Sequence, residues 1–265
     1  MKFSPIRKSK IPAPPRQQVP LIEFRNVSFS YQNEIVLENI DFRITKKEII
    51  SIVGSNGGGK TTLLKLALGL LSPTRGSITI SGMPPGKGGK FPGYVPQHIN
   101  YDKKFPSSVM EVVLSGRLGN NFFGHYTQED HAEAENVLGK ANLLHLRKRS
   151  FSNLSGGERQ RVLIARGLCG HAEIFFLDEP TASIDRNSEK DLFDLLKEVS
   201  KNAAVIIVSH DLGVVSSLSE KTLCVNRNVI IHPTSELKGE NISALYGMDI
   251  ALVNHKHSLE EGGRP

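Results

Sequence analysis

The chain has little that would place it outside the cell or across a membrane. It has no tryptophan and only two cysteines, Cys169 and Cys224, which lie far apart in apolar surroundings. Such a pair favours buried thiols in a reducing compartment over a disulfide or a metal site. No apolar run approaches the roughly 20 residues that a membrane helix needs, and none follows the basic N-terminus as in a secretory signal. We therefore expect a cytosolic chain, so that any membrane part of its activity comes from another chain.

Outside the N-terminal tail, positive and negative charges nearly balance. The formal net charge is +6, and residues 1–20 contribute +5 of it, which leaves +1 for the rest. A nucleic-acid-binding domain would carry positive charge on its folded body, so nucleic acid is not an expected partner. The five prolines among residues 1–20 predict an extended tail. This tail is either solvated or in contact with anionic lipid.

One stretch has the spacing of a phosphate-binding loop, G-x-x-x-x-G-K-[ST], between an apolar run (49–53) and a helical pattern (63–70). Glycines let the backbone turn its N–H groups onto phosphate oxygens, and the following helix adds its positive N-terminal end. Lys60 is expected to reach the β- and γ-phosphates, and the Thr61 hydroxyl to hold Mg²⁺. The residues predicted to bind the nucleotide here are Gly54, Ser55, Asn56, Gly57, Gly58, Gly59, Lys60, Thr61 and Thr62.

Two further apolar runs, residues 174–177 and 204–208, predict parallel strands that are covered on both faces. The first runs into Asp178 and Glu179, and the second leads to His210. The carboxyl ends of parallel strands meet at one edge of a sheet. We therefore expect these side chains to lie beside the glycine loop.

The chemistry expected at this edge is metal-assisted hydrolysis of a nucleoside triphosphate. Asp178 would hold Mg²⁺ beside Thr61, and Glu179 would polarise the attacking water as general base. His210 would hydrogen-bond the γ-phosphate and fix the geometry of base and water. Gln97, at another strand end, offers a neutral group to the metal or the water. The predicted catalytic residues are Glu179, His210, Lys60 and Gln97, and the predicted metal ligands are Thr61, Gln97 and Asp178.

The order of patterns predicts an α/β fold. Its core is the parallel sheet of a P-loop nucleoside triphosphatase (RecA-like), preceded by an antiparallel β subdomain in which segments between residues 22 and 44 alternate. A more polar, helical pattern predicts an inserted α-helical subdomain at about residues 98–168. We expect the parts of the chain to be a basic tail (1–20), the ATPase domain (21–237) and a C-terminal segment (238–265).

A second anion-binding element is Leu154-Ser-Gly-Gly-Glu-Arg-Gln-Arg161. A serine and two glycines open a helix there, so a hydroxyl, free N–H groups and the positive helix end come together. One triphosphate with two phosphate-binding helix ends favours a two-chain arrangement. The glycine loop of one subunit and Ser155, Gly156 and Gly157 of the other would hold the same γ-phosphate.

These elements together resemble the ATP-binding cassette (ABC) ATPase family, over about residues 21–232. The resemblance rests on the glycine loop, Gln97, residues 154–161, residues 174–179 and His210. It implies an ATPase that closes as a homodimer on ATP and drives a separate integral-membrane permease, with a solute-binding protein acting through that permease. It also implies a peripheral position at the cytoplasmic face of the plasma membrane, with Gln97 and the inserted helices forming a groove for the permease.

The resemblance assigns further roles. Tyr31 matches the aromatic residue that stacks on adenine, and residues 183–185 match a loop that communicates across the dimer. Ser155 and Gly157 would contact ATP held by the opposite subunit. The chain departs from the usual family residues at Ser55, Gly58, Glu158 and residues 183–184. The extra glycine is expected to add flexibility to the loop, and no departure removes a catalytic group.

Two stretches suggest a substrate. Residues 109–119 are similar to importers of metal ions and metal chelates, and residues 245–247, with His255 and His257 behind them, look like zinc and manganese uptake cassettes. We favour import of zinc or manganese, with an iron-siderophore or cobalamin importer as the alternative. His255 and His257 are either solvated or ligands.

A soluble cassette that does not serve transport is the other class left open. Repair members would carry a long coiled-coil insertion and translation members two cassettes, and this chain has neither. An iron–sulfur assembly cassette is harder to exclude. Co-purification with a multi-span permease would separate the two classes.

Overall fold

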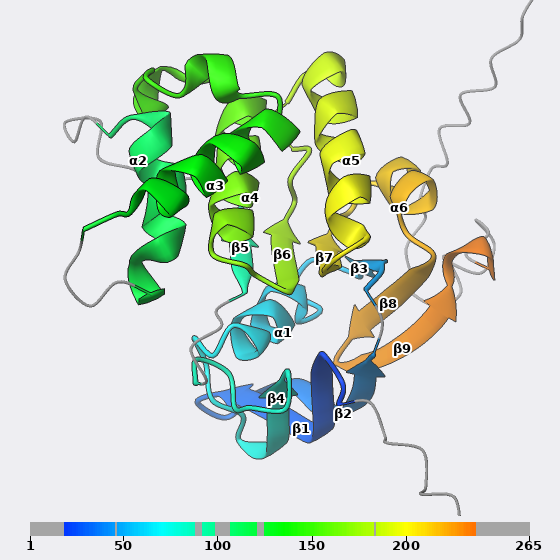
Figure 1. The fold of residues 1–265 in the computed structure, drawn as a ribbon. Coiled ribbons are helices and arrows are strands. Elements are labelled where there is room, and N and C mark those ends of the chain that lie inside the picture. Colours follow the sequence, from blue (N-terminus) through cyan, green and yellow to red (C-terminus); the bar gives the residue numbers. More distant parts are fainter. Residues whose placement is uncertain are drawn as a thin grey trace, which may run out of the picture.

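The computed structural model describes residues 19–45, 47–87, 92–98, 107–120, 125–182 and 184–236. Most of the predicted tail (1–18), Ser183, and residues 237–265 with His255 and His257 lie outside the described residues. Figure 1 shows the described helices and strands, with α2, α3 and α4 grouped at one end and a small sheet at the other.

The small sheet is antiparallel. It contains β1 (Ile22–Tyr31), β2 (Glu34–Ile44) and β4 (Arg75–Ile80) in the order β2-β1-β4. Alternate apolar residues of these strands point into the molecule, and Phe24 stacks on Phe42 with ring centroids 4.6 Å apart. The predicted antiparallel subdomain is confirmed. Its third strand, β4, is separated in the sequence from the other two by the glycine loop and its helix.

The large sheet has the strand order β5-β6-β7-β3-β8-β9. Its strands are β5 (Gly93–Val95), β6 (Ile174–Asp178), β7 (Ala204–Val208), β3 (Ile49–Val53), β8 (Lys221–Asn226) and β9 (Asn228–Pro233). All neighbouring strands are parallel except β9, which forms a hairpin with β8. Every residue of β3, β6 and β7 is buried, which explains why their sequences are continuous apolar runs.

Helices cover both faces of this sheet. Between β5 and β6 the chain forms α2 (Val109–Leu114), η1 (Ser115–Asn120), α3 (Gln128–Lys140), η2 (Leu144–Leu146), η3 (Phe151–Asn153) and α4 (Gly156–Cys169). The remaining helices are α1 (Lys60–Ala67), α5 (Arg186–Ser200), α6 (Leu212–Leu218) and η4 (Thr234–Glu236). In the part of the chain that the structure describes, no helix has the length and apolar character to cross a bilayer.

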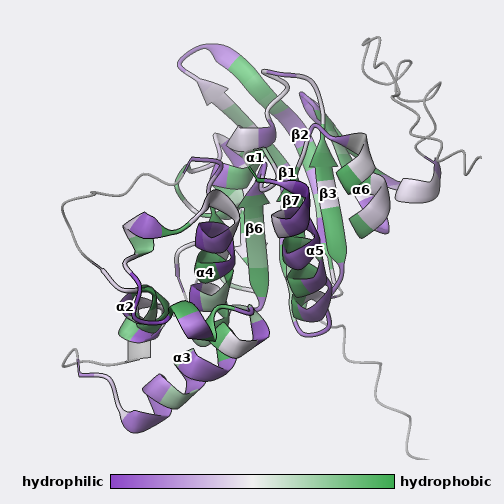
Figure 2. Ribbon diagram, turned by 90° about the horizontal axis from the view of Figure 1, so that it is seen from above, coloured by the Kyte–Doolittle hydropathy of each residue, from purple (hydrophilic) through white to green (hydrophobic). Residues whose placement is uncertain are grey.

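Side-chain alternation along the central strands divides the interior into two cores. Phe175, Leu177 and Val205 pack against α2 to α6. Phe176, Ile206 and Ile52 face the opposite way, toward α1 and the antiparallel sheet. Figure 2 shows the resulting apolar colouring of β3 and β6. Burying one such side chain contributes about 1.5–3 kcal/mol to the free energy of folding. The two cores together therefore stabilise the sheet and fix the positions of its strand ends.

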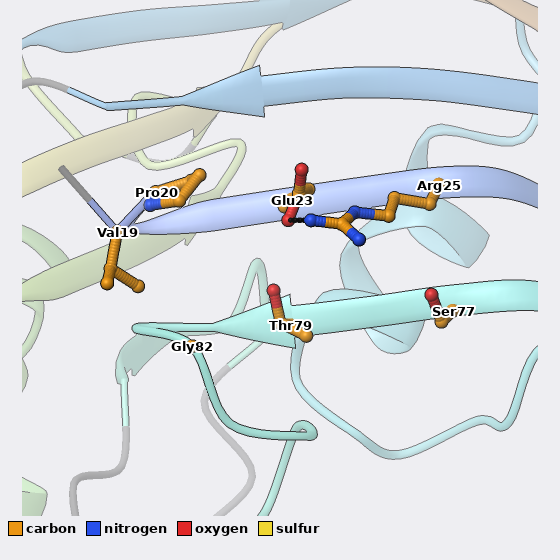
Figure 3. A pocket seen from close by; sticks show the side chains of 7 residues that line it. All are labelled: Val19, Pro20, Glu23, Arg25, Ser77, Thr79 and Gly82. Carbon is orange, nitrogen blue, oxygen red and sulfur yellow. Dashed lines mark ion pairs between the residues drawn. The ribbon is translucent and has the colours of Figure 1, made fainter. Parts of the chain in front are cut away.

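A hollow of about 300 Å³ opens on the antiparallel sheet. Figure 3 shows the side chains that line it, from Val19, Pro20, Glu23, Arg25, Ser77, Thr79 and Gly82. The Glu23 carboxylate lies 2.8 Å from the Arg25 guanidinium and 3.7 Å from that of Arg43. The hydrogen bond from Arg25 lowers the pKa of Glu23. None of the residues predicted to bind nucleotide lines this hollow, so it is separate from the candidate active site.

Close backbone contact fixes α4 against the other inserted helices. A Cβ atom at Gly116, in η1, would lie 2.1 Å from the Arg166 carbonyl oxygen of α4. A Cβ at Gly167 would lie 3.2 Å from the Cα of Gly93, in β5. The first distance requires glycine, so no side chain fits between η1 and α4, and the second is tighter than an ordinary contact between β5 and α4.

We predict that Gly116→Ala destabilises the protein by about 1–3 kcal/mol, because the backbone of α4 cannot move aside for a methyl group. The control is Gly139→Ala in α3, where an added Cβ has no atom within 4 Å. Alanine favours a helix over glycine, so this variant should be more stable by about 0.5–1 kcal/mol. Urea unfolding followed by circular dichroism measures both. Equal stability of the two variants would contradict the close contact.

Candidate active site

The carboxyl ends of neighbouring strands come together at one edge of the large sheet. The order β5-β6-β7-β3 brings the segments after these strands side by side, and these segments hold Gln97, Asp178 with Glu179, His210 and the glycine loop. Backbone hydrogen bonds continue past the strand ends. The Glu179 N–H donates to the Val208 carbonyl (2.9 Å), and the Ser209 N–H donates to the Ile52 carbonyl (3.1 Å).

The glycine loop fits tightly between β2 and the β8–β9 turn. A Cβ at Gly54 would lie 2.0 Å from the Val225 carbonyl oxygen. Gly59, which has φ = 103°, would place a Cβ 2.7 Å from the Leu37 side chain. Asn56, Gly57 and Thr61 are exposed, whereas Gly58, Gly59, Lys60 and Thr62 are buried. The loop therefore presents its exposed side to a ligand while its other side packs on the protein.

The β8–β9 turn holds the loop through backbone bonds that the sequence did not reveal. The Arg227 N–H donates to the Gly58 carbonyl (3.2 Å), and the Arg227 carbonyl accepts from the Glu38 N–H (2.9 Å). A Cβ at Gly58 would lie 2.8 Å from the Ser55 hydroxyl and 2.9 Å from the Val225 carbonyl oxygen. The two departures at positions 55 and 58 thus fit one another, and Gly58 has a steric reason beyond the expected flexibility.

The residue Lys60 is 8% exposed, and its side chain turns back into the loop. Its Nζ donates to the carbonyl oxygens of Gly54 and Ser55, at 2.9 Å each. Burial lowers the pKa of Lys60, and the charges of Glu179 and Asp178 act against that shift. A lysine cation held among backbone carbonyl groups, with acids nearby, is suited to binding phosphate oxygens.

The donor atoms near Asp178 suit a hard divalent cation. Burial raises the pKa of Asp178, the charge of Glu179 adds to this, and Lys60 opposes it. Thr61 and Gln97 would add a hydroxyl and an amide oxygen, the neutral oxygen ligands that Mg²⁺ accepts. Among the described residues, no three His, Cys, Asp or Glu side chains form a cage for a metal ion. A carboxylate, a hydroxyl and an amide oxygen together are a donor set that fits Mg²⁺.

Glu179 lies at the centre of a short hydrogen-bonded group. The Gln97 Nε2 donates to Glu179 Oε2 (2.8 Å), and His210 Nδ1 lies 3.2 Å from the same oxygen. Glu179 has φ = 46°, a left-handed conformation that turns the chain sharply as it leaves β6. Both of these contacts are to Oε2, and in the part of the chain that the structure describes no hydrogen bond to Oε1 is found.

Tyr31 ends β1 at the β1–β2 turn and is 45% exposed. The Phe29 ring meets its ring edge-on, with centroids 4.8 Å apart and planes at 86°. Phe29 therefore supports the tyrosine ring from one side, and the exposed surface of the ring is free to stack on a flat group.

Ser155 is the N-cap of α4. Its hydroxyl oxygen accepts from the Glu158 N–H (3.3 Å), and its own N–H donates to Glu158 Oε2 (2.7 Å), which is a capping box. Ser155 is exposed, whereas Gly157 is buried. Sequence reasoning named Glu158 only as a departure from the family, although the S-x-x-E spacing signals this cap.

Gly157 is closed off by the start of α5. A Cβ at Gly157 would lie 2.7 Å from the Ser188 Cβ. Asp185 caps α5 by accepting from the N–H groups of Asn187 and Ser188 and from the Ser188 hydroxyl (2.8 Å). The start of α4 and the segment that begins α5 therefore form one packed unit.

The two elements predicted to bind phosphate are the glycine loop and the start of α4. In the described ranges, no hydrogen bond or ion pair joins residues 54–62 to residues 155–157. Each element is instead held by its own neighbours, the first by β2 and the β8–β9 turn, the second by α5.

Comparison with known proteins identifies the family. The sequence pattern of the ABC transporter family matches residues 37–182. A probable metal transport system ATP-binding protein of Chlamydia trachomatis is 39% identical over 77% of this chain and 87% of its own. The zinc import ATP-binding protein ZnuC of Pasteurella multocida is 34% identical, over 91% and 89% respectively. The manganese transport system ATP-binding protein MntB of Bacillus subtilis is 36% identical, over 91% and 98%.

Solved structures agree with this result. A transporter described as metal-chelate type, in an inward-facing conformation, superposes with a TM-score of 0.76 at 33% identity, covering 86% of this chain and 88% of that one. A bacterial ABC transporter cassette solved as a dimer has a TM-score of 0.67 at 26% identity, covering 80% and 98%. With the family pattern matched over more than half of its length and relatives similar over most of it, the chain belongs to the ABC transporter family, as an ATP-binding and ATP-hydrolysing subunit.

Proposed function

We propose that this chain powers the import of zinc or manganese through a separate membrane permease. The similarity to zinc and manganese transport ATP-binding proteins over about nine-tenths of the chain carries this proposal. The likeness to a metal-chelate type transporter keeps iron-siderophore or cobalamin import as the alternative. An iron–sulfur assembly role has no comparable support, because these relatives are named for transport.

Within the site, we assign the phosphate-binding role to the exposed N–H groups of the glycine loop and to Lys60. Tyr31 stacks on the adenine. Thr61, Asp178 and Gln97 would hold Mg²⁺, which when bound offsets the negative charge of the phosphates. Burial is the main reason that the pKa of Asp178 is raised, and the charge of Glu179, which adds to that rise, is what supports a cation at this place.

Glu179 is the general base in this proposal. Gln97 and His210 both contact Oε2, so Oε1 takes the proton of the water that attacks the γ-phosphorus. The same contacts fix the direction of the carboxylate. His210 turns Nδ1 toward Glu179, which leaves Nε2 for the γ-phosphate. The bond from the γ-phosphorus to the bridging oxygen then breaks, and ADP leaves with that oxygen.

Two copies of the chain complete each site. Ser155, Gly156 and Gly157 of one copy meet the ATP held by the glycine loop of the other. A related cassette solved as a dimer supports this arrangement. The segment at Asp185, which packs beside Gly157, would lie at the same junction.

The permease would bind the inserted helices, where Leu118 in η1 is 56% exposed. The chain would then sit peripherally at the cytoplasmic face of the membrane, with a solute-binding protein acting through the permease. The boundaries at residues 20 and 237, and of the helical part at 98–168, stay predictions.

Replacing Glu179 by Gln removes the base but keeps the size of the side chain and one acceptor oxygen. We predict that ATP turnover falls at least about 100-fold and that an ATP-bound dimer accumulates. Phosphate release and light scattering after gel filtration measure the two effects. The control is Glu198→Gln, at the exposed end of α5, which should behave as the unmodified chain. Near-normal turnover of the Glu179 variant would exclude it as the base.

Mixing two inactive variants tests the shared site. Lys60→Ala disables the loop and Ser155→Arg blocks the α4 end, so each homodimer is inactive. A mixed dimer holds one intact site, so an equal mixture should recover roughly a quarter of the normal ATPase rate. A titration of one variant into the other gives the optimum. No recovery at any ratio would count against the shared site.

Deleting the gene tests the transported metal. Growth should fall under zinc or manganese limitation and recover when the unmodified gene returns, but not when the gene encodes Lys60→Ala. Growth is measured separately under zinc, manganese and iron limitation. Loss under iron limitation alone would favour the chelate alternative, and normal growth under all three would refute metal import.

A further inference from the structure

The Glu158 carboxylate lies on the positive end of α4, where the opposite subunit's phosphate is proposed to bind. Its Oε2 accepts a hydrogen bond from the Ser155 N–H (2.7 Å). In turn, the Glu158 N–H donates to the Ser155 hydroxyl oxygen (3.3 Å). Two of the N–H groups at this helix end are thereby satisfied inside the chain. A phosphate is left with the N–H groups of Gly156 and Gly157, and it would have to compete with the Glu158 carboxylate for the hydroxyl proton of Ser155.

Glu158 is an anion at neutral pH. Burial acts to raise its pKa, but hydrogen bonds from Ser155 and the charges of Arg149 and Arg161 outweigh burial and lower the pKa. The site therefore presents a negative charge within a few ångströms of the Ser155 hydroxyl. Like charges at such separation repel each other, most strongly at low salt.

Arg149 and Arg161 are the two cations whose charges act on the Glu158 carboxylate. Arg161 Nη1 pairs with Asp191 Oδ2 at 3.0 Å. The charges of Glu158, Arg149, Arg161 and Asp191 sum to zero. The helix end that would receive a triphosphate thus has its charge compensated before the phosphate arrives.

We propose that Glu158 restrains closure of the dimer, by repelling the phosphate that Ser155 must receive. This inference rests on the shared site proposed above. Glu158 acts through electrostatics and through the placement of Ser155, so it is a positioning residue and touches no reacting atom. Glutamine in its place would keep an oxygen for the Ser155 N–H and would change the local charge from zero to +1.

The test compares dimer closure with and without this charge. Closure is measured in the Glu179→Gln background as the ATP concentration that gives half dimer, by light scattering at fixed protein concentration. Adding Glu158→Gln should lower this concentration about threefold to tenfold at about 50 mM NaCl. At about 300 mM NaCl the difference should shrink, because salt screens the repulsion. A lost helix cap alone would not produce such salt dependence.

Glu198→Gln in the same background is the matched control, because it removes the same charge at the far end of α5. It should leave the required ATP concentration unchanged. Glu158→Ala, which removes both charge and cap, should also close at lower ATP than the background chain if repulsion dominates.

Three outcomes would overturn the proposal. An unchanged or higher ATP requirement for Glu158→Gln would show that its charge does not oppose closure. An equal shift for Glu198→Gln would mean that net charge alone matters. Absence of any ATP-dependent dimer in the Glu179→Gln background would refute the shared site, and the role of Glu158 with it.

Discussion

The parallel pairing of β6, β7 and β3 is the constraint on which the site depends. The chain leaves these strands at the glycine loop, at Glu179 and after Ser209, and the backbone bonds from Glu179 to Val208 and from Ser209 to Ile52 align the three exits. Side chains alternate along a strand, so a slip of one residue would turn Asp178 and its neighbours to the opposite face. The buried cores on both faces prevent such a slip.

The inserted helices use a different principle. Helix α4 is held at its start by the packing of Gly157 on Ser188 and near its end by Gly116, in both cases through a contact close enough to exclude a side chain. An element fixed at both ends moves as a unit. Movement of η1 would therefore displace Ser155. In this way the proposed permease surface is linked to the proposed phosphate-binding end of α4.

Much of this architecture is visible in the sequence because local patterns report it. Continuous apolar runs identify β3, β6 and β7, and the residues that follow them identify the edge where Glu179 and His210 lie. The backbone hydrogen bond from Arg227 to Gly58 could not be predicted, because it joins groups far apart in the sequence and needs no particular side chain. The contact of Gly116 with Arg166 was missed for the same reason. The helix cap formed by Ser155 and Glu158 could have been predicted, because these residues have the spacing of a capping box.

The two helix ends proposed to hold one ATP differ in charge. Helix α1 has no acid in its first turn and begins with Lys60, whereas the first turn of α4 contains Glu158. A positive end with a lysine attracts a triphosphate on its own, and a compensated end attracts it weakly. In the proposed arrangement, the nucleotide would therefore bind first to the loop of one chain, and the second helix would add its hydrogen bonds only when the two chains come together. This order of binding makes closure of the dimer, rather than capture of ATP, the step that other contacts can control.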